Sequence, residues 1–366
     1  MVTRRQFLAA TAAGAAGPLL LPGCASGSGG VSYDEAVEAT WHPAGSPATG
    51  HAARMRALVR HATLAPSSHN SQCWTFAPGE RGIVIRPDLA RRLPAVDPDD
   101  HHLVVSLGCA AENLAQAALA DGLMATVETA PDGAVSVALE PTRALATPLF
   151  RAIPERQCAR TEYDGTLLST EELRLLERAG TGAGVHVRLL TGRADVERVL
   201  AYVVRGNTAQ MDDPAFVEEL KAWIRFGDAE AVRTGDGLFS RASGNPSVPR
   251  WLGSRLFDSV FTADKENDKY ARHIRSSAGI AVFVSDADDA AHRVEAGRCY
   301  ERFALQATAL GVQNAFVNQP VEVPALRAEL ARALGAGERR PDLVVRFGRG
   351  PAMPRSLRRP VESVLV

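Results

Sequence analysis

Apolar residues along this chain follow two spacings, one typical of amphipathic helices and one typical of short strands. Helical spacing predicts a helix from about His51 to Leu64 and another that ends at Gly180, opened by the capping box Ser169-Thr170-Glu171-Glu172. Strands are predicted at residues 83–86, 124–127, 135–139, 185–190, 279–284, 313–317 and 343–347. Helices that alternate with short strands predict an α+β or α/β fold with three layers.

One helical pattern occurs twice. GCAAENLAQAALADGL at residues 108–123 aligns without a gap with GRCYERFALQATALGV at residues 297–312, and an apolar strand follows each. Each helix ends at a glycine, Gly122 or Gly311, that can adopt the left-handed cap conformation. The repeat predicts an internal duplication, with a first half at 51–145 and a second half at 146–366.

Residues 206–267 have no counterpart in the first half. Leu220, Trp223 and Ile224 give this insertion a narrow apolar helical face, and a stretch rich in Gly, Ser and Pro follows it. An insertion of this kind suits either a lid over a binding site or a packing element on the surface.

Composition limits the possible partners. With 46% hydrophobic and 23% charged residues, the chain can bury one large core or two fused halves. With a net charge of -1, the protein has no overall positive field that would attract nucleic acid, so DNA and RNA are excluded as partners. The five cysteines show no CxxC spacing, which argues against a zinc site and a disulfide framework. Cys109 and Cys299 lie within apolar helices and are predicted to be buried thiols.

The N-terminus has the features of an export signal. Paired arginines, Arg4 and Arg5, precede an apolar run at residues 9–21 that is shorter than the ~20 residues of a membrane span. Residues 1–30 are therefore predicted to be a twin-arginine signal, with an ordinary secretory signal as the alternative. Cys24 ends a sequence that resembles a lipobox, in which Pro22 is an unusual residue. The protein is therefore expected in the cell envelope or periplasm, with a lipid anchor on Cys24. Residues 31–50 are predicted to be a linker.

The stretch APSSHNSQCWTF at residues 65–76 suits neither a helix nor a plain strand. Pro66 should end the preceding helix. Hydroxyl and amide groups at Ser67, Ser68 and Asn70 can then bind a planar polar ligand without adding charge. The alternative is a Ser/Asn-rich turn that caps its own backbone.

This stretch resembles the flavin-contacting loop of nitroreductases, which reads PSS-x-N-x-QPW, with Cys73 in place of the usual Pro. Further matches are RQCAR at 156–160, FVNQPVE at 316–322 and SLRRP at 356–360. The layout as a whole resembles the Acg-like branch of the nitroreductase superfamily. The resemblance implies a nitroreductase-like fold, an FMN cofactor and an intramolecular pseudo-dimer that is a monomer in solution. Because neither half carries every motif, only one complete flavin site is expected.

The resemblance also assigns flavin contacts. Arg156 and Arg358 would bind the phosphate, and Arg160 would lie beside the N1 and O2 edge, where a fixed positive charge favours reduction. Any one of these arginines could instead be a surface or domain-pairing charge. Glu322 could instead stabilise the start of the following helix. The expected cofactor-binding residues are Ser67, Ser68, Asn70, Arg156, Gln157, Cys158, Arg160, Pro320, Val321, Glu322 and Arg358.

Two acidic clusters invite a metal-binding interpretation. They lie at residues 97–102 and 286–292, each before a long apolar helix, so we interpret both as helix N-caps. The sequence has no GxGxxG dinucleotide motif.

The resemblance implies an oxidoreductase that passes hydride from NAD(P)H through flavin N5 to a nitroaromatic, quinone or similar small-molecule acceptor. No catalytic side chain is predicted, since the chemistry would occur on the flavin. One alternative is a non-catalytic flavin-binding or storage protein whose insertion closes the site. A second alternative is an envelope lipoprotein with a vacant flavin site.

Overall fold

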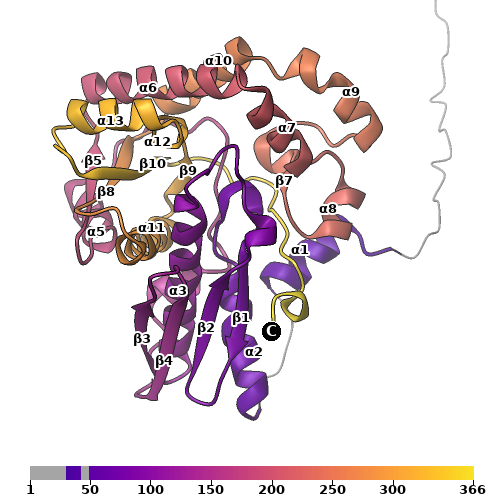
Figure 1. Cartoon of the computed structure of the whole chain (residues 1–366), viewed down its shortest axis with the longest axis vertical. Helices are drawn as coiled ribbons and strands as arrows, with labels where there is room; N and C mark the ends of the chain where they lie inside the picture. Colours follow the sequence, from indigo (N-terminus) through magenta and orange to yellow (C-terminus); the bar gives the residue numbers. More distant parts are fainter. Residues whose placement is uncertain (1–29, 43–48) are drawn as a thin grey trace, which may run out of the picture. The chain divides into compact units, whose positions relative to one another are not determined.

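Two antiparallel four-stranded sheets are joined through a pair of long helices, α3 (His101–Ala120) and α11 (Ala290–Ala309) (Figure 1). The computed structural model describes residues 30–42 and 49–366. Apart from Gly30, the predicted signal segment lies outside these residues, as does Cys24. The elements below all belong to one unit, residues 32–366. Their mixture of helices and sheets confirms the predicted α+β class.

The two sheets have the same strand order. In the first sheet the order is β1 (Trp74–Pro78), β2 (Gly82–Pro87), β4 (Val135–Pro141) and β3 (Leu123–Thr129). In the second it is β5 (Val185–Leu190), β8 (Gly279–Ser285), β10 (Arg340–Gly348) and β9 (Gln313–Phe316). In each half the long helix connects the second and third strands along the chain. An internal duplication predicts this correspondence.

Helices α3 and α11 cross closely at two glycines. A Cβ atom on Gly108 would lie 2.0 Å from the Val294 carbonyl oxygen, and one on Gly297 would lie 1.9 Å from the Val105 carbonyl oxygen. The two contacts are reciprocal, because each glycine lies against the carbonyl of the residue three positions before the glycine of the other helix. Only glycine permits the two backbones to approach this closely.

The two sheets differ in how their outer faces are covered. In β4, buried and exposed side chains alternate, as in a sheet with one face in water. Every residue of β8 is buried, because α6 (Arg193–Met211), α10 (Ala263–Arg275) and α13 (Pro324–Ala333) cover the outer face of the second sheet. The uninterrupted apolar sequence of β8 reflects this two-sided burial.

These covering helices belong largely to an insertion between β5 and β8, whereas residues 79–81 suffice to join β1 to β2. The insertion also contains α7 (Pro214–Trp223), α8 (Asp228–Thr234), α9 (Arg250–Val260) and the parallel pair β6 (Ile224–Arg225) and β7 (Leu238–Phe239). The sequence-predicted segment 206–267 lies inside it. The predicted domain boundaries remain a prediction.

Part of the expected linker is a helix, α1 (Tyr33–Trp41). Ser32 and Glu35 form a capping box at its start, and Tyr33 and Trp41 are buried. The Tyr33 hydroxyl donates a hydrogen bond to the Arg355 carbonyl oxygen (2.6 Å), which ties the helix to the C-terminal segment. The linker prediction is therefore wrong for residues 33–41.

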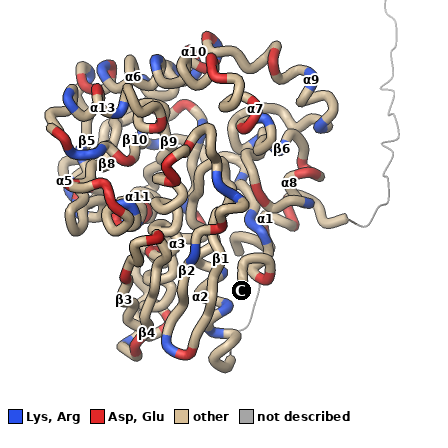
Figure 2. Tube along the Cα trace, in the orientation of Figure 1, with Lys and Arg blue, Asp and Glu red and all other residues tan. Residues whose placement is uncertain are grey.

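The C-terminal segment pairs with the first half. The Phe76 amide donates to the Val364 carbonyl (2.8 Å), and the Val366 amide donates to the Phe76 carbonyl (2.9 Å). Three further helices complete the chain: α4 (Pro148–Ala152), α5 (Thr170–Ala179) and α12 (Gln319–Glu322). Acidic and basic residues are interspersed along the elements (Figure 2), consistent with the small net charge.

Several local predictions are confirmed. The predicted first helix is α2 (His51–Thr63), and the Ser169 capping box opens α5. Gly122 and Gly311 both adopt positive φ angles, +75° and +68°. Cys109 and Cys299 are buried free thiols. Helix α3 is long and apolar enough to span a membrane, but most of it is buried in the core.

Candidate active site

The loop after α2 has an unusual backbone that its neighbours hold in place. His69, Asn70 and Gln72 have φ angles of 51–52°, in the left-handed region that non-glycine residues rarely adopt. The Ser67 hydroxyl accepts a hydrogen bond from the Gln72 amide (2.8 Å), and the Gln72 side chain donates to the Gly235 carbonyl (2.8 Å). Strained backbone that is fixed in this way is common at functional sites.

This loop forms one wall of a cavity of about 380 Å³. Ser67, Ser68 and His69 line the wall from the first half, and α12 lines it from the second half with Gln319 and Glu322. Helices and loops of the insertion supply much of the remaining lining, together with α3, β9 and β10. A volume near 380 Å³ suits a small-molecule ligand.

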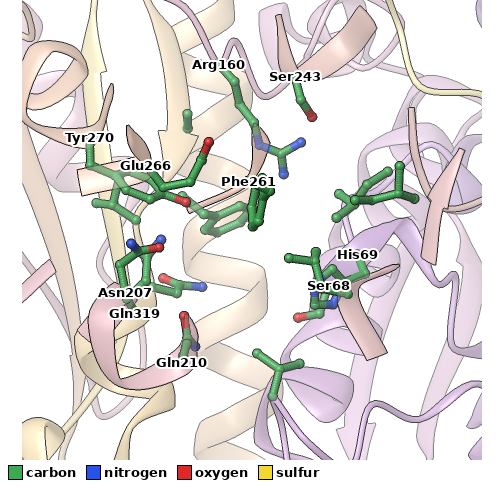
Figure 3. Close-up of a pocket in the computed structure, with 18 of the residues that line it drawn as sticks. Ser68, His69, Arg160, Asn207, Gln210, Ser243, Phe261, Glu266, Tyr270 and Gln319 are labelled. Carbon is green, nitrogen blue, oxygen red and sulfur yellow. The ribbon is translucent and has the colours of Figure 1, made fainter. Parts of the chain in front are cut away.

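Arg160 reaches into this cavity (Figure 3). In the described part of the chain, no hydrogen bond or ion pair engages its guanidinium. The Arg346 guanidinium donates to the carbonyls of Ala159 (2.9 Å) and Thr161 (2.6 Å), so it fixes the backbone on both sides of Arg160. Arg160 is thus a half-buried cation on an anchored segment, available to a ligand.

His69 and Glu322 are among the titratable groups that line the cavity with Arg160. Burial lowers the pKa of His69 to about 4, and the Arg160 charge contributes to that lowering. His69 is therefore neutral at neutral pH. Burial raises the pKa of Glu322, whose carboxylate accepts a hydrogen bond from Gln210 (2.7 Å). The Glu322 carboxyl group thus retains a proton more readily than an exposed glutamate.

Arg156, predicted to bind phosphate, does not line the cavity. Its buried guanidinium pairs with Glu301 (3.2 Å) and donates to the Leu64 carbonyl (2.8 Å). Burial raises the pKa of Glu301 to about 7, although the Arg156 charge opposes that rise. In this structure Arg156 therefore pairs with a buried carboxyl group, and its contact with a phosphate stays a prediction.

Arg358 and Asn70 also lie outside the cavity lining. The Arg358 guanidinium donates to the carbonyls of Thr63 (2.9 Å), Leu64 (3.0 Å) and Ala65 (3.1 Å), at the end of α2. The Arg358 guanidinium also donates a hydrogen bond to the side-chain oxygen of Asn70 (3.0 Å). Both residues were predicted to contact the flavin. Here Arg358 satisfies carbonyls that the end of α2 leaves without partners, and the Asn70 amide donates to the carbonyls of Gly237 and Leu357 (both 3.1 Å).

The other predicted contacts make structural interactions. Gln157 exchanges two hydrogen bonds with the Met353 backbone, at 3.2 and 2.6 Å. The backbone of Cys158 pairs with that of Asn314 in a single parallel β-bridge, and the Cys158 Sγ atom lies 3.9 Å from the Tyr300 hydroxyl oxygen. Pro320 and Val321 are buried within α12. Of the predicted contacts, those that line the cavity are Ser67, Ser68, Arg160 and Glu322.

Sequence reasoning missed several lining residues. His102, Ser106 and Cys109 reach the cavity from α3, where the apolar pattern indicated only core. The 97–102 cluster was interpreted as a helix cap, and Asp97 does accept hydrogen bonds from the His102 and Leu103 amides (3.0 and 2.8 Å). The second cluster also caps its helix, since Asp289 accepts from the His292 amide (2.9 Å). Among residues 30–42 and 49–366, no three potential ligands gather at a metal site.

The position equivalent to this cavity in the other half is filled. In the repeat alignment, Ser106 and Cys109 correspond to Glu295 and Arg298, which form an ion pair (3.0 Å). Glu112 binds Arg298 (3.2 Å) as well. A Cβ atom on Gly182, in the loop after α5, would lie 2.1 Å from a Glu295 carboxylate oxygen. Charged side chains and a tightly packed loop occupy the second position.

Comparison with known proteins relates the chain to one group of enzymes. No protein-family model matches it. Over 327 residues it is 27% identical to two proteins of Mycobacterium tuberculosis, strains CDC 1551 and H37Rv, that carry the provisional name NAD(P)H nitroreductase. The match covers 85% of this chain and 90% of each relative. These relatives support a place in the nitroreductase superfamily.

Solved structures with similar folds have low TM-scores. One is the FMN-dependent nitroreductase NfnB of Mycobacterium smegmatis in complex with NADPH, with 15% identity, a TM-score of 0.39 and coverage of 59% of this chain and 96% of that one. Another is a provisionally assigned nitroreductase of Anabaena variabilis, with 8% identity, a TM-score of 0.41 and coverage of 86% and 91%.

Proposed function

We propose that this protein is an FMN-dependent oxidoreductase of nitroreductase type, which uses NAD(P)H to reduce a nitroaromatic, quinone or similar acceptor. The observation that carries the proposal is the free Arg160 guanidinium in a cavity between the two halves, opposite the Ser67 and Ser68 loop. The relatives named NAD(P)H nitroreductases support it independently. Bound FMN would supply hydride acceptance and donation.

The lining fits the ring of this cofactor better than its phosphate. Arg160 can hold the edge on which negative charge accumulates, and hydroxyls of Ser67 and Ser68 can meet polar ring atoms. Because His69 is neutral, the loop that carries Ser67 and Ser68 adds no charge of its own to this part of the cavity. Arg156 and Arg358 are engaged within the protein, so the phosphate would need another partner or a rearrangement of both side chains.

The walls can also manage protons and water. Reduction of a quinone or nitro group by hydride also consumes protons, and the Glu322 carboxyl can hold one at the cavity wall. Helices of the insertion line much of the cavity and restrict the access of water to it, while Leu256 and Val260 leave its apolar end open to solvent.

A storage function is the second candidate, because the insertion contributes so much of the cavity lining. Phe261 lies in the middle of the lining residues, between Ser68 and His69 on one side and Tyr270 on the other (Figure 3). A closed insertion of this form would retain a bound flavin and limit access by NAD(P)H.

One titration distinguishes the two candidates. The purified protein is loaded with FMN and titrated with NADPH without oxygen while the visible flavin absorption is followed. Loss of the flavin band supports the oxidoreductase, and a band that persists supports storage. Failure to bind FMN contradicts both. Arg160→Met should weaken FMN binding about tenfold or more, since it removes the free cation from the cavity.

We also propose that the protein acts as a monomer in which the two halves form an intramolecular pseudo-dimer. The matching strand orders and the reciprocal glycine contacts of α3 and α11 support this proposal. The acceptor is a small molecule, and nucleic acid is not expected as a partner. Limited proteolysis with and without FMN would show whether the insertion moves as a lid.

Export by the twin-arginine route to the cell envelope, with a lipid anchor on Cys24, is proposed from the sequence alone. Changing both Arg4 and Arg5 to Lys should leave the protein in the cytoplasm. Cys24→Ser should release it from the membrane fraction without blocking export. Normal export of the double-lysine variant would contradict the twin-arginine route.

A further inference from the structure

The cavity has two chemically different ends. Between the halves it is polar, with Arg160, Asn207 and Gln319 pointing inward (Figure 3). Towards the insertion it is apolar, lined by Phe216 and Leu220 of α7, Phe226, and Leu256 and Phe257 of α9. A ligand that fills both ends must therefore be amphipathic.

No charged side chain lines the α7 and α9 end of the described cavity. The charged residues that the insertion does contribute lie on α10, where Lys269 is paired with Glu266 (2.8 Å). A phosphate or carboxylate at the apolar end would lose water without gaining a partner, which is costly. This end suits an uncharged, hydrocarbon part of a ligand.

The apolar lining continues to the surface of the protein. Phe261 lies within the cavity, and Phe257 stacks on it with ring centres 4.9 Å apart. Leu256 and Val260, which are one turn apart on α9, also line the cavity, yet they are 45% and 58% exposed. A hydrocarbon chain that follows these residues would cover apolar surface that otherwise faces water.

We propose that the acceptor is a planar quinone-like molecule with an aliphatic tail, whose head would lie next to FMN in the polar part of the cavity and whose tail follows α9 past Phe261, Leu256 and Val260. This inference rests on the proposed oxidoreductase function and names its substrate class. A small acceptor without a tail would leave the α9 wall uncovered. Each tail methylene that becomes buried should tighten binding about fourfold.

The test measures binding without turnover. Quinones with one common head and tails of increasing length are titrated into the FMN-loaded, oxidised protein, and Kd is determined by calorimetry. We expect Kd to fall about fourfold for each buried methylene and to level off once the tail extends beyond Val260. Leu256→Glu and Val260→Glu should each raise the Kd of a long-tailed quinone at least tenfold and leave that of the tail-less quinone unchanged.

Trp251→Glu is the matched control. Trp251 lies on the same helix and is 71% exposed, but it does not line the cavity, so this variant should bind every quinone as the wild type does. A Kd that does not depend on tail length, or an equal effect of all three variants, would overturn the inference. Val260→Glu keeps the test valid if Leu256→Glu disturbs folding, because Val260 is the more exposed of the two.

The same preparations separate this inference from the proposed function. If the protein takes up FMN and NADPH reduces it, but Kd is independent of tail length, only the tail-bearing acceptor is refuted. If the protein takes up no FMN, the oxidoreductase proposal fails and the inference falls with it.

Discussion

Arg156, Arg160 and Arg358 were all predicted from sequence motifs to contact the flavin, but their surroundings give them different roles. Arg156 and Arg358 both donate to the Leu64 carbonyl (2.8 and 3.0 Å), one beside the Glu301 carboxylate and the other at the end of α2. Arg160 faces the cavity. A guanidinium can neutralise a buried carboxylate, cap a helix or bind a ligand, and only its surroundings decide which.

Replacing Arg156 should therefore affect folding more than cofactor binding. In Arg156→Met the Glu301 carboxylate remains buried without its partner, which should lower the free energy of unfolding by about 3 to 5 kcal/mol at pH 8. The loss should be smaller at pH 5, because Glu301, with a pKa of about 7, is then protonated. Urea unfolding at both pH values measures this.

Arg160→Met is the contrasting variant. It should change the free energy of unfolding by about 0.5 kcal/mol or less, because its side chain has no partner among the described residues. If Arg156→Met instead kept full stability and lost FMN affinity, Arg156 would be the phosphate ligand that the sequence motif predicted.

Asp342 should make stability depend on pH. It lies at an irregularity in β10 and is buried, with the Ser285 hydroxyl donating to it (2.7 Å) and His101 at 3.3 Å. Burial raises the pKa of Asp342 to about 7 from its ordinary 3.8. The folded state thus holds a proton that the unfolded state releases between pH 4 and 7. The contribution of Asp342 to stability therefore decreases as pH rises through that range.

The comparison with Asp342→Asn isolates this effect. The free energy of unfolding of the variant, relative to wild type, should increase by at most about 1.4 kcal/mol per pH unit between pH 4 and 7, then become constant. Asp286→Asn should not show this trend, because the His186 hydrogen bond lowers the pKa of Asp286. A flat difference for Asp342→Asn would mean that Asp342 is ionised in the folded protein.

At the scale of elements, the α3–α11 crossing is the contact most sensitive to side-chain size. Gly108→Ala and Gly297→Ala would each place a methyl group about 2 Å from a carbonyl oxygen, so each should destabilise the protein by about 1 to 3 kcal/mol. Because both glycines serve one crossing, the double variant should not be additive. Thermal unfolding of the single and double variants measures both effects.

Gly79→Ala provides the control for this pair. Gly79 is exposed between β1 and β2, and the nearest atom to its added Cβ lies 3.6 Å away, so the change should be within about 0.5 kcal/mol. Equal, small effects at Gly79, Gly108 and Gly297 would refute the close crossing.

Elements with a strong apolar pattern could be predicted from the sequence, and contacts between distant residues could not. The continuous apolar run of β8 and the Ser169 capping box indicated the right structures. The helix α1 was missed because it is short and its Ser32–Glu35 capping box lies in a stretch that otherwise suits a linker. Local signals of this kind decide secondary structure but not its surroundings.

The candidate site depended more on distant contacts. Glu301, the partner of Arg156, is far away in the sequence, so no local spacing could indicate that the arginine was already paired. The apolar end of the cavity is built from α7 and α9, whose side chains have no counterpart in the first half. The loop at residues 65–76 was recognised because its polar residues fit no regular element.

At the scale of the whole molecule, the two halves are related in topology but differ at the positions where a ligand could bind. Ser106 and Cys109 leave room for the cavity, whereas Glu295 and Arg298 fill the equivalent position with an ion pair. Opening that second position would expose or separate charges that now neutralise each other, including Glu112. The asymmetry favours one ligand site for each chain.

If the two halves form the proposed intramolecular pseudo-dimer, the protein should bind one FMN per chain while remaining a monomer. Released flavin, measured by absorbance against protein concentration, should give a ratio near one, and light scattering should give the mass of a single chain. A ratio near two would show that Glu295 and Arg298 do not close the second position. A ratio near one in a two-chain particle would instead contradict the intramolecular interface, because the flavin site could then be completed by a second copy.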